Sequence, residues 1–543
     1  MILNHKTFQA INGKSFDLLI MGGGINGVSI LKEATERGYN CLLFDNNDFS
    51  RGATAHSSRL IHGGLRYLEY FEFGLVYESL SSRTYLLKNF PHLVKPLNLN
   101  IPIFKTRGRP SWMVKSGLIL YDLLSLKKTL PNHKKLSHSE FQSLFPQFNL
   151  QDLKTVYSYF DAQIEWPERL VFQILNSVPQ NGISVNYSII SSYQKTESGH
   201  QFNLKSLINN ESVNFSSKMV INATGSWVDL ANQKLQKNTN HTGGTKGSHL
   251  VYLLQMTPLS QAIYVEAKQD GRPFFILPWN GMTLIGTTDI FYHDSLDRII
   301  ISEGEKQYIE TELNTLFKDF IEQPIHYSFS GIRPLPKVDL KHSTSKITRR
   351  HSFNWLNSDK SMIDVIGGKL TTFPALSQDL LKLTDSFFRK KTNHSSFFAK
   401  DKPFIYHLEN LKKEYRRLFL LFEVHLNEED CERLISFYGS DLLNYCSLNE
   451  NINKKDFQKL HHSLNQYIIE IKYCIQTESV FTWSDLFERR TDIAANIGSN
   501  VQKWNELFTC LMNSNLNVDF TGITTEDYLK EFIAVRFPFS QKK

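Results

Sequence analysis

The chain has 543 residues, of which 41% are hydrophobic and 21% charged, and its formal net charge is +7. This length predicts two or three domains of roughly 100–200 residues each, and the composition is typical of a folded protein and excludes extensive disorder. The positive charge is too small for this length to indicate a nucleic-acid-binding protein. It favours a small anionic substrate or a loose attraction to anionic lipid.

The N-terminus and the cysteines predict a cytoplasmic protein. Residues 1–15 carry basic side chains but no apolar core, which predicts no signal peptide, and no apolar run is long enough to predict a membrane-spanning helix. The cysteines lack CxxC spacing, and we expect them to be reduced and structural, without a metal site. They are Cys41, Cys431, Cys446, Cys474 and Cys510.

The stretch from residue 16 to residue 45 has the pattern of a dinucleotide-binding unit. An apolar run at Phe16–Met21 breaks into Gly22–Gly27, and a helical pattern follows. A second buried run, Cys41–Phe44, stops at Asp45. The order of strand, glycine turn, helix, strand and acid predicts a parallel sheet that binds a dinucleotide at its carboxyl edge.

The glycines of this turn have separate functions. Gly22 permits the tight turn, Gly24 lets a pyrophosphate approach the backbone, and Gly27 lets the helix lie close to the sheet. The helix start offers N–H groups and a positive dipole end to the phosphates. Asp45 lies eighteen residues after Gly27, where a carboxylate can accept hydrogen bonds from ribose hydroxyls.

Residues 48–68 combine small, hydroxyl-bearing and basic residues. Ser57 and Ser58 can hydrogen-bond phosphate or ring atoms, and the sequence then brings Arg59, His62, Arg66 and Tyr67 together with two glycines. His62 and Arg66 are four residues apart, so on a helix they would share a face. The alternative is a surface helix with solvated basic residues, although a Gly pair is costly inside an ordinary helix.

Blocks in one order over residues 16–375 carry a resemblance to a known family. Gly22–Gly27 and Ser57–Glu69 resemble the FAD-dependent glycerol-3-phosphate dehydrogenases, the flavin enzymes and not the NAD-linked ones. The further blocks are Asn222–Val228, Lys246–His249, Leu277–Trp279, Ile285–Asp289, Ser330–Leu335, Gly367–Thr372 and, more weakly, Arg489–Thr491.

The residue patterns and the resemblance together predict an α/β fold. We expect a FAD-binding Rossmann-like parallel sheet, an inserted, mainly antiparallel substrate domain, and a C-terminal α-helical domain. The expected ranges are an N-terminal tail at 1–15, the FAD-binding domain at 16–90, 151–225 and 326–395, the substrate domain at 91–150 and 226–325, and the helical domain at 396–543.

Local patterns place the individual elements. Strands are expected at 182–185, 218–222, 250–254, 273–277, 282–286 and 361–366, with a hairpin or meander over 191–217. Helices are expected at 167–178, 302–320, 408–422, 428–438, 453–476 and 500–512, and after Pro374. The segment 112–126 is amphipathic and basic at its ends; it can lie in a membrane interface, or it is an ordinary packed helix.

The resemblance implies a reaction in which sn-glycerol 3-phosphate is oxidised to dihydroxyacetone phosphate and FAD takes the hydride. Arginine forks suit the substrate phosphate, so Arg66 and Arg333 are expected to bind substrate, with Tyr67 donating a hydroxyl contact. Lys369 is expected near the flavin's carbonyl side or the substrate oxygens. An interdomain ion pair is the alternative for Arg333.

A histidine near neutral pKa is the natural acceptor of the substrate's hydroxyl proton. His62 is preferred over His249 because its Gly-Gly neighbours indicate close approach; a packed histidine is the alternative for each. Arg333 and Lys369 complete the expected catalytic set. The cofactor contacts expected are Gly22, Gly23, Gly24, Asn26, Gly27, Asp45, Ser57, Ser58, His62, Gly63, Gly64, Ala223, Thr224, Gly225, Gly367, Gly368, Lys369, Leu370, Thr371 and Thr372.

The sequence departs from the family pattern in three places. Asp45 stands where many relatives carry Glu, and the shorter arm can still reach ribose. Ala53–His56 replaces a Thr-Ser-Ser run, which removes two hydroxyls that can touch FAD. Phe373-Pro374 stands where relatives usually have Tyr-Arg, which removes a cation near the flavin.

Four functions remain open at this point. The first is a dehydrogenase that passes electrons to quinone at the inner face of the cell membrane, attached peripherally to anionic lipid and assembled as a homodimer. The second is an oxidase that reduces oxygen to hydrogen peroxide. The third is a flavoenzyme of another small hydroxy or amino acid, and the fourth is a flavin-binding protein with a decayed site.

Overall fold

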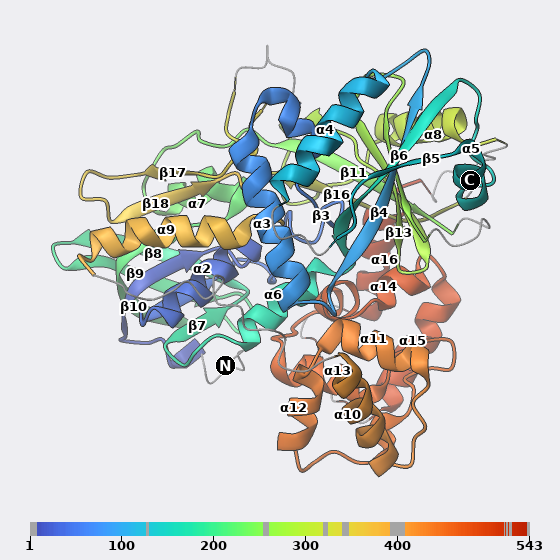
Figure 1. Cartoon of the computed structure of the whole chain (residues 1–543). Coiled ribbons are helices and arrows are strands. Elements are labelled where there is room, and N and C mark those ends of the chain that lie inside the picture. The colour runs from blue at the N-terminus through green and yellow to red at the C-terminus, as the bar shows by residue number, and fades with distance from the viewer. Residues whose placement is uncertain are drawn as a thin grey trace.

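Figure 1 shows two sheets side by side, with a body of helices below them formed by the C-terminal part of the chain. The computed structural model describes residues 8–125, 130–253, 260–318, 324–338, 347–390, 408–514, 516, 520 and 524–539. Among these residues, every helix is too short or too polar to cross a bilayer. The expected segment 112–126 is described only to residue 125.

The first sheet is the predicted parallel one. Its order is β17-β18-β10-β1-β2-β7, and β1, β2, β7, β10 and β18 run parallel, with β17 antiparallel at the edge. The strands are β1 (Ser15–Met21), β2 (Cys41–Phe44), β7 (Gly182–Val185), β10 (Ser212–Asn222), β17 (Ser352–Trp355) and β18 (Met362–Ile366). The nearly unbroken apolar runs of β1, β2 and β18 are typical of strands that are covered on both faces.

One stretch of this sheet differs from the prediction. The hairpin expected over 191–217 and the strand expected at 218–222 share a single long strand, β10. Its first half pairs antiparallel with β9 (Gly199–Ser206), which pairs with β8 (Ser188–Thr196), and it pairs parallel with β1 along most of its length. The alternating pattern and the apolar run looked like two elements because only the second half is buried on both faces.

Helices position the glycine turn on this sheet. Helix α2 (Ile25–Glu36) begins directly after the turn and contacts both α9 (Phe373–Phe387) and α6 (Pro167–Asn176). Pro374 lies in the first turn of α9, where no N–H bond is lost. Leu376, Leu380 and Leu381 of α9 are fully buried, and each contributes about 1.5–3 kcal/mol relative to an exposed side chain.

The second sheet has the order β15-β11-β14-β13-β12-β4-β6-β3, with β16 also paired to β11 and β5 to β6. All of its pairs are antiparallel except β12 with β4. Its strands are β3 (Leu60–Ile61), β4 (Val94–Phe104), β5 (Lys134–Leu136), β6 (Leu153–Ile164), β11 (Thr245–Tyr252), β12 (Ala262–Glu266), β13 (Pro273–Trp279), β14 (Met282–Gly286), β15 (Ile290–Phe291) and β16 (Ile325–Arg333).

Strand membership in the second sheet departs from the predicted domain ranges. The ranges 16–90, 151–225 and 326–395 were expected in the FAD-binding domain, but β3 and β6, and β16 from Ile325 to Arg333, pair within the second sheet. The sequence shows that each is a buried strand, while its partners are fixed by contacts far away in the chain. For β6 the partner is β4, some sixty residues earlier.

Of the remaining helices before residue 390, α7 (Val228–Lys234) packs on β8, β10 and β18 of the first sheet, and the others lie at the second sheet or at its junction with the first. These others are the 3-10 helix η1 (Leu65–Tyr70), α3 (Phe73–Asn89), α4 (Ser111–Leu124), α5 (His138–Leu144) and α8 (Glu303–Leu316), with the short turn η2 (Gly225–Trp227). Helix α8 begins at the predicted capping box of Ser302 and Glu305.

The C-terminal part is helical, as predicted. It contains α10 (Leu408–Leu421), α11 (Glu428–Tyr438), α12 (Asp441–Leu448), α13 (Ile468–Thr477), α14 (Ile493–Ile497), α15 (Val501–Asn513) and α16 (Thr525–Arg536), with the short turns η5 (Lys454–Phe457) and η6 (Asp485–Arg490). The single helix expected over 453–476 is wrong: η5 ends at Phe457, and Lys459 then forms a β-bridge with Tyr467 before α13 begins.

Candidate functional site

The glycine turn lies at the carboxyl edge of the parallel sheet, against the end of β10. Gly22 has φ +105°, and a Cβ there would lie 2.7 Å from the carbonyl oxygen of Ala223. A Cβ on Gly27 would lie 1.9 Å from the carbonyl oxygen of Gly22. Neither position has room for a side chain, so the backbone of the turn is held close to both the sheet and α2.

Asp45 closes over the same turn. Its carboxylate accepts hydrogen bonds from the backbone N–H groups of Gly23 at 2.7 Å and of Asn47 at 2.8 Å. Burial raises the pKa of Asp45 to about 6, against the lowering effect of these two N–H groups. The structure therefore places the predicted acid, Asp45, beside the glycine turn, although Asp45 follows β2 and the turn follows β1.

The loop after β18 also lies at this edge of the sheet, beside the glycine turn. Gly367 and Gly368 have φ of +76° and +86°, and a Cβ on Gly368 would lie 3.2 Å from the side-chain nitrogen of Asn26. The side-chain oxygen of Asn26 is buried and has no partner among the described residues. Three glycine-lined loops and an unpaired buried acceptor at the start of a helix fit a dinucleotide that supplies the missing donor.

Ala53–His56 does not leave this region without a hydroxyl. The Thr54 hydroxyl accepts a hydrogen bond from the backbone N–H of Ile25 at 3.1 Å, at the start of α2. A Cβ on Gly24 would lie 3.3 Å from the same oxygen. Thr54 therefore supplies the one hydroxyl of this segment, and in this structure it is bound to the start of α2.

Lys369 follows this glycine loop and reaches the basic segment predicted from residues 57–69. Its ammonium nitrogen lies 3.9 Å from the centre of the Tyr67 ring and 3.4 Å from the Ser79 hydroxyl. A Cβ on Gly64 would lie 3.6 Å from that nitrogen. Burial, with a smaller effect of Arg349, lowers the pKa of Lys369 to about 7.

His62 lies on the same side, at the end of β3. Its backbone N–H donates to the Thr371 hydroxyl at 3.2 Å, which ties the His62 segment to the loop after β18. Burial, together with Lys369 and Arg349, lowers the pKa of His62 to about 3. His62 and Arg66 do not lie on one helix, because η1 begins only at Leu65, after Gly64 in a left-handed conformation.

Arg349 is a cation that the sequence reasoning missed. Its charge acts on four of the predicted site residues, lowering the pKa of His62, Tyr67, Arg333 and Lys369 below what their other surroundings would give. It precedes β17 as one of two adjacent arginines, in a stretch without glycines or periodicity. The only feature of the sequence that could have indicated Arg349 is the pair of adjacent arginines, Arg349 and Arg350.

Arg333 is bound mainly by protein groups. Its guanidinium forms an ion pair with Asp289 at 2.8 Å and donates to the Thr287 hydroxyl at 3.0 Å and to the Thr288 carbonyl oxygen at 3.1 Å. Burial lowers the pKa of Arg333 to about 10. Arg333 therefore forms an ion pair, as the alternative supposed, but within the second sheet and not between domains, where it joins β16 to the loop after β14.

His249 has a different environment from His62. Its Nε2 lies 2.8 Å from the Ser58 hydroxyl, and its ring stacks on Phe329 with centres 4.9 Å apart. Its Nδ1 is buried and has no partner in the described part of the chain. Burial, with Arg333 and Arg59, lowers the pKa of His249 well below its usual value. Both histidines are therefore neutral near pH 7 in the unliganded site, and the same burial makes each of them a weaker base than a free histidine.

The other predicted residues fall into two groups. Arg66 donates to the Tyr70 hydroxyl at 3.4 Å, while its Nε is buried without a partner among the described atoms. Gly63 donates to the Tyr121 hydroxyl at 2.8 Å, so its backbone serves local packing. Ala223, Thr224 and Gly225 lie in the loop after β10, Leu370 and Thr372 in the loop after β18, and Ser57 in the segment between β2 and β3.

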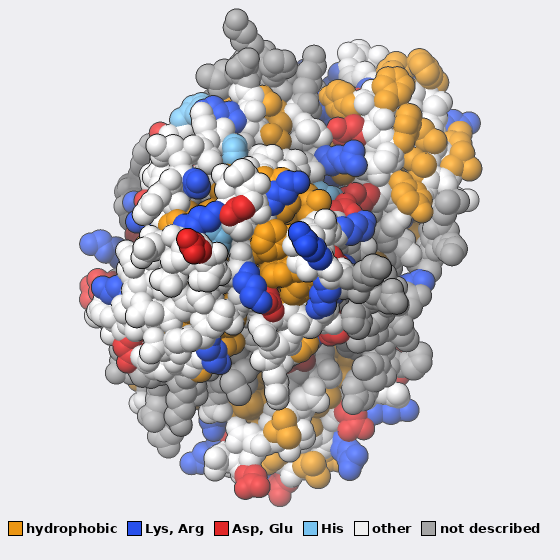
Figure 2. Space-filling model, turned by 90° about the vertical axis from the view of Figure 1, so that its left-hand side faces the viewer, with side chains coloured by type: hydrophobic (Ala, Val, Ile, Leu, Met, Phe, Trp, Pro, Cys, Tyr) orange, Lys and Arg blue, Asp and Glu red, His pale blue; other side chains and the backbone are white. Residues whose placement is uncertain are grey.

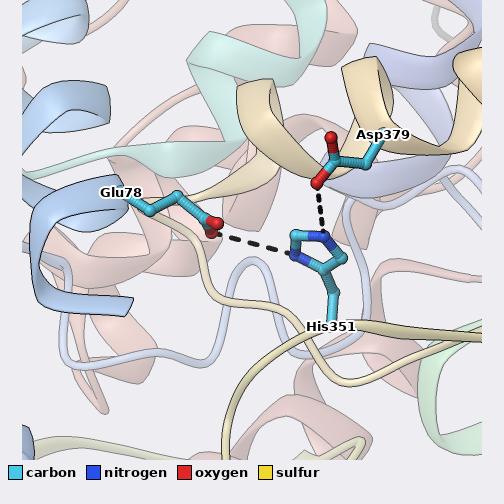
Figure 3. A group of neighbouring side chains, drawn as sticks. All are labelled: Glu78, His351 and Asp379. Carbon is cyan, nitrogen blue, oxygen red and sulfur yellow. Dashed lines mark hydrogen bonds and ion pairs between the residues drawn. The ribbon is translucent and has the colours of Figure 1, made fainter. Parts of the chain in front are cut away.

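A further polar group lies beside this site, between α3, α9 and the segment before β17. His351 approaches Asp379 with Nε2 at 3.2 Å and Glu78 with Nδ1 at 3.8 Å (Figure 3). The two ring nitrogens point to different carboxylates, so His351 links α3 to α9. It connects the Arg349 segment to α3, which carries Ser79, and to α9.

Comparisons with known proteins agree with this architecture. Residues 17–354 match the family described as FAD dependent oxidoreductase, and residues 403–521 match the C-terminal domain of alpha-glycerophosphate oxidase. The chain is 36% identical over 510 residues to a glycerol-3-phosphate dehydrogenase of Synechocystis, which covers 90% of this chain and 91% of that protein. It is 28% identical over 543 residues to an aerobic glycerol-3-phosphate dehydrogenase of Staphylococcus saprophyticus, covering 96% and 94%.

Solved structures resemble the fold. The glycerol-3-phosphate dehydrogenase of Bacillus halodurans, complexed with FAD, aligns with a TM-score of 0.75 at 22% identity and covers 99% of this chain and 98% of that one. The L-alpha-glycerophosphate oxidase of Mycoplasma pneumoniae, with FAD bound, aligns with a TM-score of 0.53 at 18% identity, covering 68% and 95%. These likenesses show the two-sheet fold and, for the first, the C-terminal helical domain.

Proposed function

Since the chain belongs to the FAD-dependent glycerol-3-phosphate dehydrogenase family, with FAD as its cofactor, we propose that it oxidises sn-glycerol 3-phosphate to dihydroxyacetone phosphate and passes the electrons to a quinone. The observation that carries the substrate assignment is the set of half-buried cations around Tyr67. Lys369 lies on its ring, and although burial raises the pKa of Tyr67, the positive charges of Arg349, Arg333 and Arg66 act against that rise. Such a set favours a dianionic phosphate.

The residues that would hold FAD are those of the three loops at the sheet edge. The N–H groups at the start of α2 would bind the pyrophosphate, with Gly22, Gly24 and Gly27 giving access and Asn26 completing its own bonds. Asp45 would exchange its present N–H partners for ribose hydroxyls. When bound, FAD supplies the acceptor for the hydride that leaves carbon 2 of the substrate.

The chain's own residues would bind the substrate and take its proton. Lys369, Arg349 and Arg66 would hold the phosphate, since Arg66 Nε lacks a partner among the described atoms and the Lys369 ammonium contacts the Tyr67 ring and, at 3.4 Å, the Ser79 hydroxyl, but no described carboxylate. Arg333 would fix the wall of the site through Asp289. His62 or His249 would accept the hydroxyl proton, because burial keeps both neutral.

The two histidines differ in what fixes the ring. The Ser58 hydroxyl is bonded to His249 Nε2, and the buried Nδ1 of His249 has no partner among the described residues. The imidazole of His62 instead lies under the influence of the positive charge of Lys369. We keep His62 as the proposed base, because it shares the loop contact with Thr371 and lies next to the proposed phosphate cations. His249 is the second candidate, on the strength of its free nitrogen.

A lipid surface is the proposed location of the acceptor. Helix α4 exposes Trp112, Ile119 and Leu123, at 68%, 44% and 65% of their surfaces, and Lys105 and Lys115 lie exposed nearby. Helix α4 contacts η1 and α3, which with the link between them expose Tyr70, Phe71, Phe73 and Tyr77. Figure 2 shows hydrophobic side chains gathered at the upper right of the molecule. Apolar residues with flanking lysines fit an anionic membrane surface on the cytoplasmic side.

The experiment is a product assay with two acceptors. The protein with FAD is incubated with glycerol 3-phosphate and either a soluble quinone analogue or dissolved oxygen, and dihydroxyacetone phosphate, reduced quinone and hydrogen peroxide are measured. The proposal expects product in step with quinone reduction and little peroxide. Rapid peroxide formation would replace the quinone acceptor by oxygen, and absence of product with either acceptor would refute the substrate assignment.

A further inference from the structure

The C-terminal helical domain contacts one segment of the cofactor half that lies close to the proposed FAD site. Segment 48–59 follows Asp45 and leads to β3 and His62. Nothing in the comparisons assigns a role to the C-terminal domain beyond its match to a domain of the same kind. The contacts of this segment show what that domain does to it.

The first contact is a buried ion cluster at Asp48. The Asp48 carboxylate is fully buried and accepts from Arg489 Nε at 2.5 Å, from the Arg490 guanidinium at 2.8 Å and from the Asn186 side chain at 2.9 Å. Burial alone would raise the pKa of Asp48, but Arg490 and Arg489 lower it to about 2. The carboxylate therefore stays charged and fixed between two guanidinium groups of η6.

Both arginines are themselves anchored in the C-terminal domain. Arg490 donates to the carbonyl oxygens of Glu478 at 2.7 Å and Ser479 at 3.3 Å, and Arg489 donates to Asp485 at 2.7 Å. Because both guanidinium groups are also bonded to other groups of the C-terminal domain, their positions do not depend on Asp48 alone, and they fix the position of the Asp48 carboxylate.

The second contact lies eight residues further on, at His56. His56 Nδ1 lies 3.1 Å from the Gly52 carbonyl oxygen, so this nitrogen carries the proton, and Nε2 accepts from the Arg536 guanidinium at 3.3 Å. Arg536 belongs to α16 and forms an ion pair with Glu488 of η6 at 2.6 Å. Burial lowers the pKa of His56 well below its usual value, which keeps the ring neutral and suited to accept this bond.

Between these two contacts the segment lies on the glycine turn. A Cβ on Gly23 would lie 2.4 Å from the Phe49 ring, and the Ser50 N–H donates to the Gly23 carbonyl oxygen at 3.0 Å. Thr54 accepts from Ile25 at the start of α2. Any displacement of residues 48–56 would therefore move the atoms that line the turn.

We propose that the C-terminal helical domain clamps segment 48–59 through Arg489, Arg490 and Arg536, and that this clamp holds the glycine turn in the shape that binds FAD. The inference rests on the proposed placement of FAD at residues 22–27. Asp48 and the three arginines act as positioning residues, since their contacts are with the segment and its neighbours. Loss of these contacts is expected to weaken FAD binding more than it slows the oxidation of substrate by the FAD-bound protein.

The test compares Asp48→Asn with a matched control in the same domain. Asp48→Asn keeps the shape and removes the charge that holds Arg489 and Arg490. The control is Arg433→Gln, which breaks another buried, bidentate ion pair, with Glu470 at 2.6 and 2.8 Å, far from segment 48–59 in the sequence and wholly within the C-terminal helices. The dissociation constant of FAD is measured by fluorescence titration of the full chain, together with the melting temperature.

If the clamp exists, the FAD dissociation constant should rise at least tenfold in Asp48→Asn and less than twofold in Arg433→Gln. This difference should hold even if both variants have lower melting temperatures than the unaltered protein. Equal FAD binding in Asp48→Asn and the unaltered protein would overturn the clamp. If Asp48→Asn does not fold, His56→Ala leaves the Asp48 cluster intact and is expected to weaken FAD at least threefold; unchanged affinity there overturns the proposal. Failure of the unaltered chain to bind FAD, or unchanged binding in Gly27→Ala, would instead refute the placement of FAD.

Discussion

Replacement of Lys369 by methionine tests the proposed phosphate site. Methionine keeps much of the volume but removes a cation that lies beside Tyr67 and Ser79 and faces Arg349. Truncating one partner of a buried, hydrogen-bonded charge pair costs about 2–5 kcal/mol. Because Arg349 and Arg66 remain, we expect the lower part of this range, about 2–3 kcal/mol, which corresponds to a roughly 30- to 150-fold weaker affinity for glycerol 3-phosphate.

The pH dependence adds a second readout. Lys369 has a pKa of about 7 in the unliganded site, so it loses its charge as the pH rises through this value. The affinity for the dianion should therefore fall above about pH 7, and in Lys369→Arg, which stays charged, this fall should disappear. Below about pH 6 the substrate phosphate itself gains a proton, which weakens binding in both proteins.

The assay is titration of the flavin absorbance with the product, dihydroxyacetone phosphate, which binds without turnover. Lys218→Met serves as the control, because Lys218 is exposed and pairs with Asp17 on the opposite end of the parallel sheet. The reasoning would be refuted if Lys369→Met bound the product within twofold of the unaltered protein, or if the affinity of Lys369→Arg fell above pH 7 as steeply.

Three further predictions follow from other contacts. Gly27→Ala should abolish FAD binding and lower the melting temperature, because its Cβ would lie 1.9 Å from a backbone oxygen. Gly74→Ala in α3, which has open space around its Cβ, is the control and should leave FAD binding unchanged. FAD affinity is measured by fluorescence titration and stability by thermal melting. His62→Asn and His249→Asn should separate the two proton acceptors: the true base loses about 10²–10⁴ in the rate of anaerobic flavin reduction, and the other histidine much less, as measured by stopped flow. Trp112→Ser with Leu123→Ser should reduce sedimentation with anionic vesicles at least fivefold without changing FAD affinity, and unchanged sedimentation would exclude α4 as the lipid contact.

Local patterns predicted the cofactor half well. The turn at Gly22–Gly27, the strand before it and α2 after it are fixed by short-range sterics, and the structure confirms this arrangement. Asp45 could be placed because its distance from the turn follows from one βαβ unit. The parallel sheet, the antiparallel sheet and the C-terminal helices were likewise predicted from strand and helix patterns.

The pairing of distant segments could not be predicted in the same way. Arg333 looked free to bind an anion, whereas its contact with Asp289 requires that β16 and the loop after β14 meet at β11. Arg349 lies in a stretch without a motif, and its position depends on the approach of β17 to the loop after β18. Arg489 and Arg490 were noticed only as a weak block, because their partner Asp48 lies more than four hundred residues earlier.

The central claim is that cations beside a flavin select a small phosphorylated alcohol for oxidation. The most direct measurement is the flavin spectrum of the purified protein during anaerobic addition of glycerol 3-phosphate, with glycerol, lactate and glycine added in parallel. The account predicts that the yellow absorbance disappears within seconds with glycerol 3-phosphate and persists with the other three. A flavin that stays oxidised with glycerol 3-phosphate, or that is reduced equally by lactate or glycine, would contradict it.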